Sequence, residues 1–246
     1  MRPLSTLDRR TLLKALTFAP AVAAVPGAVL AEVQGAGLIS TDVFLVSPEL
    51  NAGPFYVDPK LVRSDITEGR PGLPMTLRLQ VVRADCTPVE GARVDLWHCD
   101  AGGVYSGVRN LASGADAVGQ TFLRGTQATD STGVVTFQTI FPGWYPGRTT
   151  HMHCMVHLDG NMVLTSQIFF DEAVNQAIYD DHEAYARDGA RNTRNADDTI
   201  AADAGNGAHA RVKMTEPDGA MEAALVMGIT PEGGPSGLLD WLWKSA

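Results

Sequence analysis

Two histidines separated by one residue are the side chains best suited to chemistry in this sequence. His151 and His153 end the run 143–153, which reads Gly-Trp-Tyr-Pro-Gly-Arg-Thr-Thr-His-Met-His. In a β-strand these two residues project from the same face with Cα atoms about 7 Å apart, so their imidazoles can share one metal ion. A His-x-His pair alone is a weak indication, since two packed or exposed histidines give the same pattern. His157 continues this face but lies about 13 Å along the strand from His153, which predicts either a structural role or a place next to the ligands without binding the metal.

Two tyrosines lie in glycine-flanked loops at the ends of predicted strands. Tyr105 belongs to the glycine-rich segment 101–107, and Tyr145 lies six residues before His151 at the start of a Tyr-Pro turn. Loops at strand ends are places where functional side chains concentrate. Taken alone, each tyrosine is more often a packing residue than a ligand, so these two are candidates only because of where they lie.

The elements that must position these residues follow from the spacing of apolar side chains. Alternating and apolar runs predict five short strands: 75–81, 92–96, 135–141, 151–157 and 162–170. A turn at 88–91 separates the first two strands, and 25 glycines with 14 prolines predict many more turns. This pattern favours an all-β fold, an antiparallel β-sandwich with a short helix and long loops.

The second half of the chain has fewer signals. A short helix is expected from 172 to 185, with Asp171 as its N-cap. Residues 186–220 are polar, rich in Gly, Asp and Asn, and indicate little regular structure. Residues 238–243 are apolar, and we expect them to dock on the body of the domain.

The first 31 residues have the pattern of an export signal. Four basic residues precede an apolar run that starts at Ala15 and ends in Val29-Leu30-Ala31. The adjacent pair Arg9 and Arg10 resembles a twin-arginine signal, although an ordinary secretion signal with two arginines is an alternative. We therefore expect an exported protein, periplasmic or extracellular, with no membrane anchor once the signal is removed. Cleavage after Ala31 is left open.

We divide the remaining chain into an N-terminal arm, 32–74, and a sandwich domain, 75–246. The net charge of −9 argues against nucleic-acid binding, which needs a basic surface. The three cysteines at 86, 99 and 154 are an odd number, and no Cys-x-x-Cys pair indicates a cysteine metal site. If the first two strands form a hairpin, Cys86 and Cys99 are too far apart to join, and the pairing is left open.

Four motifs in order resemble one known family, the intradiol ring-cleavage dioxygenases, which include protocatechuate 3,4-dioxygenase and catechol 1,2-dioxygenase. The motifs are Val94–Tyr105, Pro142–Pro146, Arg148–His153 and Thr165–Phe170. The resemblance covers roughly half the chain, from about Gly53 to Phe170. Because the long helical N-terminal linker of the catechol branch is missing, the chain looks closer to the protocatechuate branch. Gly147 and a very short connection from Tyr145 to the histidines depart from that branch and leave the pocket shape open.

The resemblance implies a non-haem Fe(III) ion held by Tyr105, Tyr145, His151 and His153. The chemistry of these groups agrees, since phenolate oxygen is a hard anionic ligand that favours Fe(III) and imidazole binds iron generally. The pKa of an unperturbed tyrosine is near 10, so the metal must supply the deprotonation.

The resemblance also assigns roles around the metal. Tyr145 is the ligand that substrate displaces and that accepts a substrate proton. Arg148 stabilises negative charge that develops on the ring. Gln167 matches a polar residue beside the ligands, and Tyr56 and Trp97 match substrate-binding pocket walls.

The expected function is aromatic catabolism: cleavage of a catechol-type ring between its hydroxyl-bearing carbons with O2, giving a cis,cis-muconate. One alternative is a non-catalytic prealbumin-like binding module, because 87–94 also resembles the strand-turn pattern of such modules. A second is a Zn or Cu protein that uses only the histidine pair. The sequence leaves open which catechol is the substrate and whether the chain forms a homo-oligomer.

Overall fold

Alternating apolar residues form the first sheet of the sandwich. β1 (Pro74–Arg83) buries Met75, Leu77 and Leu79. It pairs antiparallel with β6 (Val134–Ile140) and parallel with β10 (Met221–Ile229). β9 (Arg211–Met214) pairs with β10 at the edge, so the strand order is β6-β1-β10-β9.

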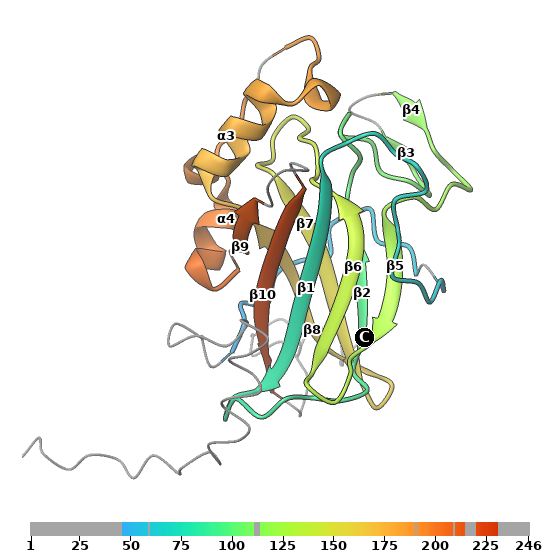
Figure 1. Cartoon of the computed structure of the whole chain (residues 1–246), viewed down its shortest axis with the longest axis vertical. Coiled ribbons are helices and arrows are strands. Elements are labelled where there is room, and N and C mark those ends of the chain that lie inside the picture. The colour runs from blue at the N-terminus through green and yellow to red at the C-terminus, as the bar shows by residue number, and fades with distance from the viewer. Residues whose placement is uncertain are drawn as a thin grey trace, which may run out of the picture. The chain divides into compact units, whose positions relative to one another are not determined.

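The second sheet is antiparallel throughout and has the order β5-β2-β7-β8. Its strands are β5 (Arg124–Ala128), β2 (Arg93–Trp97), β7 (His151–Leu158) and β8 (Asn161–Phe169). The two sheets lie one against the other (Figure 1). One apolar core contains residues of both, with Leu77 and Phe137 from the first and Leu96 and Cys154 from the second. The predicted all-β sandwich and its five strands are confirmed. The parallel pairing of β1 with β10 was not predicted. Parallel strands need a long connection, and the long segment between β8 and β10 brings the chain back to the first sheet in the required direction.

This computed structural model describes residues 46–58, 60–110, 114–189, 191–208, 210–214 and 220–230. The described residues belong to one unit, Leu38–Ala246. The predicted signal at 1–31, the first part of the predicted arm and the apolar tail at 238–243 lie outside the described residues.

The hairpin considered for the first two strands does not form. β1 and β2 lie in different sheets, and the turn near Gly91 carries the chain from one sheet to the other. Two alternating strands joined by a turn are compatible with either arrangement, because alternation fixes only which face of a strand is buried. Cys86, Cys99 and Cys154 are all free thiols.

The described helices lie between β8 and β9 in the chain. α3 (Glu172–Asp181) and the 3-10 turn η1 (Glu183–Tyr185) cover the predicted helix, although the side chain of Asp171 makes no capping hydrogen bond. Within 186–220 the structure adds β9 and three helical elements that the sequence did not indicate: η2 (Asn195–Asp197), α4 (Thr199–Ala204) and η3 (Gly205–Ala208). α3 and α4 lie on the same side of the sandwich in Figure 1. None of the described helices is long and apolar enough to cross a membrane.

Strand β7 is buried on both faces, so it carries core residues on one face and enclosed polar residues on the other. Met152, Cys154 and Val156 point into the sandwich core. His151 and His153 project from the other face and are each only 1% exposed. Residues 47–51 run along the edge of β8, with Leu50 N bonded to Thr165 O. On the outer face, the fully buried Gln167 side chain donates through Nε2 to Asn51 O.

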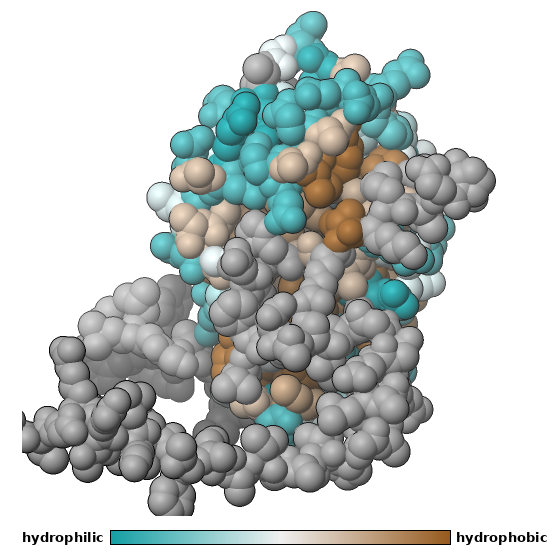
Figure 2. Space-filling model, turned by 60° about the vertical axis from the view of Figure 1, so that its left-hand side comes forward, coloured by the Kyte–Doolittle hydropathy of each residue, from teal (hydrophilic) through white to brown (hydrophobic). Residues whose placement is uncertain are grey.

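Few large apolar side chains are exposed in the part of the chain that the structure describes. The exposed large apolar residues are scattered along the described chain: Val46, Val57, Val62, Val118 and Met162. Figure 2 shows hydrophilic side chains over most of the upper described surface, with hydrophobic residues in small groups. Single exposed apolar residues are ordinary for soluble domains.

Phe137 tests the sandwich core. It is fully buried on β6, and Phe137→Ala should lower the free energy of unfolding by about 3–5 kcal/mol because it leaves a cavity. Denaturant unfolding measures the change. Thr136→Ala, on the other face of the same strand, is the control and should cost less than about 1 kcal/mol. Equal losses in both variants would show that the core does not lie between these sheets.

Candidate active site

The register of the second sheet aligns the candidate residues in rows. Trp97 on β2, His153 on β7 and Gln167 on β8 are direct cross-strand partners, so their side chains share the outer face. His151 lies in the next row along β7, opposite Phe169. The ring centroids of His151 and His153 are 4.8 Å apart with the rings nearly perpendicular. The prediction that both imidazoles share one face is confirmed.

One nitrogen of His151 is the meeting point of the site. Its Nδ1 lies 2.7 Å from Thr149 O, a contact in which only the ring N–H can donate, so Nε2 keeps a free lone pair. Tyr145 Oη lies 2.9 Å from that Nε2, and Tyr105 Oη lies 3.4 Å from it. Arg148 Nη1 is also 3.4 Å from it. The loops that carry the two tyrosines therefore bring both hydroxyls to one point.

His153 is held by its neighbours' rings. It stacks on Trp97 with ring centroids 5.0 Å apart and planes 6° apart. Its Nδ1 is buried and has no hydrogen-bond partner among the described residues. Gly53 lies against the His153 ring, and a Cβ at this position would come within 3.2 Å of His153 Cε1. Gly53 also has φ +64°, so both space and backbone favour glycine at this position.

Burial keeps all four groups neutral in the absence of a cation. It raises the pKa of Tyr105 well above its ordinary value and that of Tyr145 to about 12. Burial and the nearby Arg148 guanidinium lower the pKa of His151 to about 3, and burial with His151 lowers that of His153. Both phenols are therefore protonated when no metal is bound, whereas a phenol is a strong metal ligand only as the phenolate. A bound cation favours loss of the phenolic protons, because a metal deprotonates its ligands.

These residues fit a metal ion. Protein nitrogen and oxygen ligands lie about 2.0–2.2 Å from a metal such as zinc, so two ligand atoms at right angles are about 3 Å apart. The distances from His151 Nε2 to the two phenolic oxygens, 2.9 and 3.4 Å, bracket that separation. No group of three or more His, Cys, Asp and Glu side chains gathers in the part of the chain that the structure describes. The tyrosines Tyr105 and Tyr145 are thus needed to complete a ligand set with His151 and His153.

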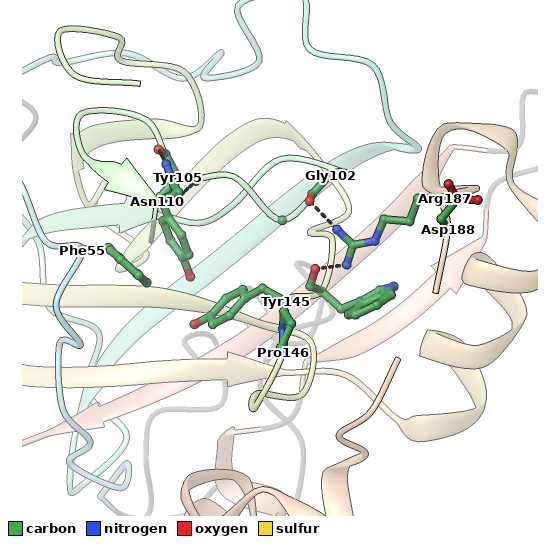
Figure 3. A pocket seen from close by; sticks show the side chains of 10 residues that line it. Phe55, Gly102, Tyr105, Asn110, Tyr145, Pro146, Arg187 and Asp188 are labelled. Carbon is green, nitrogen blue, oxygen red and sulfur yellow. Dashed lines mark hydrogen bonds between the residues drawn. The ribbon is translucent and has the colours of Figure 1, made fainter. Parts of the chain in front are cut away.

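A cavity of about 240 Å³ opens beside the phenols. It is lined by Phe55, Gly102, Gly103, Tyr105, Asn110, Trp144, Tyr145, Pro146, Arg187 and Asp188. Figure 3 shows the hydroxyls of Tyr105 and Tyr145 directed toward the same part of the cavity, with Arg187 at its other end. Phe55 stacks on Tyr105 with centroids 4.6 Å apart. Flat aromatic walls with two hydroxyls at one end suit a planar ring ligand.

Comparison with known proteins identifies the family. A sequence model of the family described as Dioxygenase matches residues 47–210. The solved intradiol ring-cleavage dioxygenase of Tetranychus urticae is 33% identical, with a TM-score of 0.71, over 78% of this chain and 97% of that one. The chain belongs to the intradiol ring-cleavage dioxygenases.

Curated relatives of this intradiol dioxygenase match a shorter part of it. Chlorocatechol 1,2-dioxygenase of Pseudomonas sp. (strain P51) is 28% identical over 116 residues, 40% of this chain and 44% of the relative. Catechol 1,2-dioxygenase 1 of Acinetobacter lwoffii is 28% identical over 163 residues, 57% of this chain and 50% of the relative. The chain spans about half the length of the curated relatives it matches.

Arg148 and Gln167 of the dioxygenase lie together beside the histidines. Arg148 Nη2 donates to Gln167 Oε1 at 2.6 Å, and Arg148 Nε donates to Asp198 Oδ2 at 2.8 Å. Gln167 Nε2 donates to Asn51 O at 2.9 Å. The structure thus brings all six predicted metal and catalytic residues into one cluster.

The two predicted pocket walls, Tyr56 and Trp97, pack together beside His153. Neither Tyr56 nor Trp97 is among the residues that line the cavity. Tyr56 packs edge-on against Trp97, with centroids 4.9 Å apart, and its hydroxyl donates to Asp95 Oδ2 at 3.0 Å. His157 Nε2 is 3.5 Å from the same carboxylate, away from the histidine pair, in agreement with its predicted structural role.

Several residues of the site have no separate signal in the sequence. Asn110 holds the Tyr105 backbone, accepting from its N–H and donating to its carbonyl, each at 2.8 Å. Arg124 is 2% exposed and bonds to both oxygens of Ser106, the residue after Tyr105. Asp198 has only the pattern of an N-cap, an acidic residue followed by Thr-Ile-Ala-Ala.

Proposed function

We propose that this intradiol dioxygenase is a non-haem Fe(III) enzyme that cleaves a catechol-type ring between its two hydroxyl-bearing carbons with O2. The product is a cis,cis-muconate-type dicarboxylate. The observation that carries the proposal is the convergence of Tyr105 and Tyr145 on His151 Nε2, with the His153 ring beside it. Relatives named catechol and chlorocatechol 1,2-dioxygenase support the substrate class.

Tyr105, Tyr145, His151 and His153 would hold the ion. When bound, Fe(III) supplies Lewis acidity that draws electron density from the ring and makes a ring carbon reactive toward O2. Tyr145 Oη is the half-buried phenol on the cavity wall, so it is placed to accept a proton from a substrate hydroxyl. Tyr105 is 1% exposed and held by Asn110, so it stays in place.

The remaining residues orient the substrate and stabilise charge. Phe55 and Trp144 form apolar walls that exclude water from the ring. Arg148 Nη1 faces the ligand cluster and stabilises negative charge on the substrate as the ring reacts. Gln167 is fully buried and holds the Arg148 guanidinium through Nη2.

Oxygen uptake with a panel of catechols tests the activity. Iron-loaded protein should consume O2 with catechol, hydroxyquinol, protocatechuate or a lignin-derived catechol, and the product should be the dicarboxylate of cleavage between the hydroxyls. A product of cleavage beside the hydroxyls, or no uptake with any catechol, would refute the proposal.

The colour of the purified protein separates the alternatives. Tyrosinate bound to Fe(III) absorbs visible light, so the protein should be red-brown with one iron per chain. Colourless protein with stoichiometric zinc would favour a site that uses only His151 and His153. Colourless, metal-free protein would favour a prealbumin-like binding module.

Tyr145→Phe should weaken the visible band and slow turnover, because it removes one phenolate ligand while keeping the ring. The ring contact with Phe55 is preserved, so the circular dichroism should be unchanged. Tyr185→Phe is the control, since its hydroxyl bonds to Phe141 O outside the ligand cluster. An identical visible spectrum in Tyr145→Phe and the parent protein would refute this ligand.

We also propose that residues 1–31 direct export by the twin-arginine route. The support is the pair Arg9 and Arg10 ahead of the apolar run. Replacing both arginines with lysine in a bacterium that has this route should leave the protein in the cytoplasm. Unchanged export of the double variant would indicate an ordinary secretion signal instead.

A further inference from the structure

Asp198 is a buried carboxylate directly beside Arg148. Its side chain is 2% exposed, and both oxygens are fully used. Oδ2 accepts from Arg148 Nε at 2.8 Å and from Thr149 N at 2.9 Å. Oδ1 accepts from Ile200 N at 2.9 Å and Ala201 N at 3.2 Å, which caps α4. One carboxylate therefore ties the loop before β7 to the start of α4.

The Arg148 guanidinium is fixed from two sides. Asp198 binds its Nε, and Gln167 binds its Nη2. Gln167 is itself anchored by Asn51 O, so it offers a fixed acceptor. With both of these positions taken, Nη1 is the part directed at the ligand cluster, 3.4 Å from His151 Nε2.

A free arginine side chain has many rotamers, and fixing one of them costs conformational entropy. A fixed guanidinium can stabilise charge on a reacting ring without reorganising during the reaction. The carboxylate contributes most to that fixing, because a hydrogen bond between two opposite charges is stronger than the one that the guanidinium donates to the neutral amide oxygen of Gln167. Neither Asp198 nor Arg148 is among the residues that line the cavity. Apart from backbone N–H groups, Arg148 is the partner of the Asp198 carboxylate, so Arg148 is the side chain through which Asp198 can act.

We propose that Asp198 is a positioning residue that holds Arg148 in the orientation that ring cleavage requires, which makes the start of α4 part of the active site. The proposal rests on the proposed function, since it gives Asp198 its role through Arg148. It assigns a use to a segment, 195–201, in which the sequence showed no chemistry.

The state of the carboxylate agrees with this role. Burial alone would raise the pKa of Asp198, but hydrogen bonds from Thr149 N and Arg148 outweigh it and hold the pKa below its ordinary value. The group is ionised at neutral pH. An asparagine amide has one acceptor oxygen where the carboxylate has two, so it can serve the Arg148 side or the helix end, not both.

Asp198→Asn therefore tests the proposal. We expect kcat with the preferred catechol to fall about 10- to 100-fold, with KM changed less than about 3-fold, because effects of this size are typical of residues that orient a site. Asp203→Asn is the matched control, since Asp203 lies exposed on the same helix and should leave kcat unchanged.

A double-mutant cycle separates positioning from a structural role. In an Arg148→Ala background, Asp198→Asn should lower kcat no further, because the group that it positions is gone. An equal fold-loss in both backgrounds would mean that Asp198 only maintains the fold, and would overturn the proposal.

A crystal structure of the Asp198→Asn protein gives a readout that does not depend on activity. The Arg148 guanidinium should leave its place against Gln167 Oε1. An unmoved guanidinium overturns the proposal whether or not the enzyme is active. Absence of oxygen uptake by the parent protein refutes the proposed function instead, so the two failures are distinguishable.

Discussion

His151→Ala should remove bound iron and the visible band and lower turnover by more than about 100-fold. Loss of a residue that merely supports a metal ligand already costs about 10- to 100-fold, so loss of a ligand costs at least as much. His151 Nε2 is also the atom on which both phenols converge, at 2.9 and 3.4 Å. Without it Tyr145 and Tyr105 lose their common partner. Iron content per chain, the visible spectrum and oxygen uptake measure the change.

His182→Ala is the control for this variant. His182 lies at the end of α3, caps η1 and contacts Tyr185, away from the ligand cluster. It should keep its iron and its turnover. A His151→Ala protein that still binds one iron per chain with an unchanged band would contradict the ligand set. Circular dichroism of both variants checks that the sandwich is intact.

The histidine pair was predictable because its geometry is local. A period of two places His151 and His153 on one face of any strand, and the register of β7 confirms it. The strand that carries the pair and the strand that follows it were also predicted, from the apolar residues in 151–157 and 162–170. Tyr105 and Tyr145 are different: their loops bring them to His151 through contacts across the chain, and only the family resemblance predicted that meeting.

The pairing of strands was less predictable, for a physical reason. Alternation says which face of a strand is buried but not which strand lies beside it. β1 and β2 alternate equally well as hairpin partners or as members of two sheets, and the structure has the second arrangement. β10, which pairs parallel with β1, follows a long polar segment in which the sequence indicated no strand.

Residues that reach the site from irregular segments were missed for a related reason. Asn51 contacts the site through its backbone carbonyl, and Asp198 is the N-cap of α4. Neither residue belongs to a sequence spacing that distinguishes it from an ordinary loop residue. Tyr56 and Trp97 show the opposite case. Their motif positions were recognised, but Trp97 stacks on the His153 ring, Tyr56 packs against Trp97, and neither is among the residues that line the cavity beside the phenols.

The two faces of β7 explain why the site tolerates so much buried polarity. Its inner face, with Met152 and Cys154, belongs to the sandwich core and fixes the strand. The outer face is then free to carry imidazoles whose hydrogen bonds and ligands come from loops. Stability and chemistry are thus assigned to opposite sides of one strand, and a rigid strand is a precise support for ligands.

Arg148→Ala should keep the iron and the visible band but lower kcat about 100- to 1000-fold, the usual cost of removing one group that stabilises developing charge. None of the four proposed ligands is altered, and Arg148 Nη1 lies 3.4 Å from His151 Nε2, so the variant removes a cation beside the ligand cluster without removing a ligand. KM should change little, because a transition-state interaction affects kcat and kcat/KM alike. Steady-state oxygen uptake and the visible spectrum measure the two effects separately.

The controls for Arg148→Ala distinguish charge from geometry. Arg109→Ala removes an exposed arginine whose ion pair with Asp116 contributes little, and it should leave turnover unchanged. Arg148→Lys keeps the positive charge but not the planar fork that spans Asp198 and Gln167. If the lysine variant is nearly as slow as the alanine variant, the fixed orientation of the guanidinium matters more than its charge. Turnover equal to the parent protein in Arg148→Ala would remove this residue from the mechanism, because no other described cation is hydrogen-bonded to the ligand histidines.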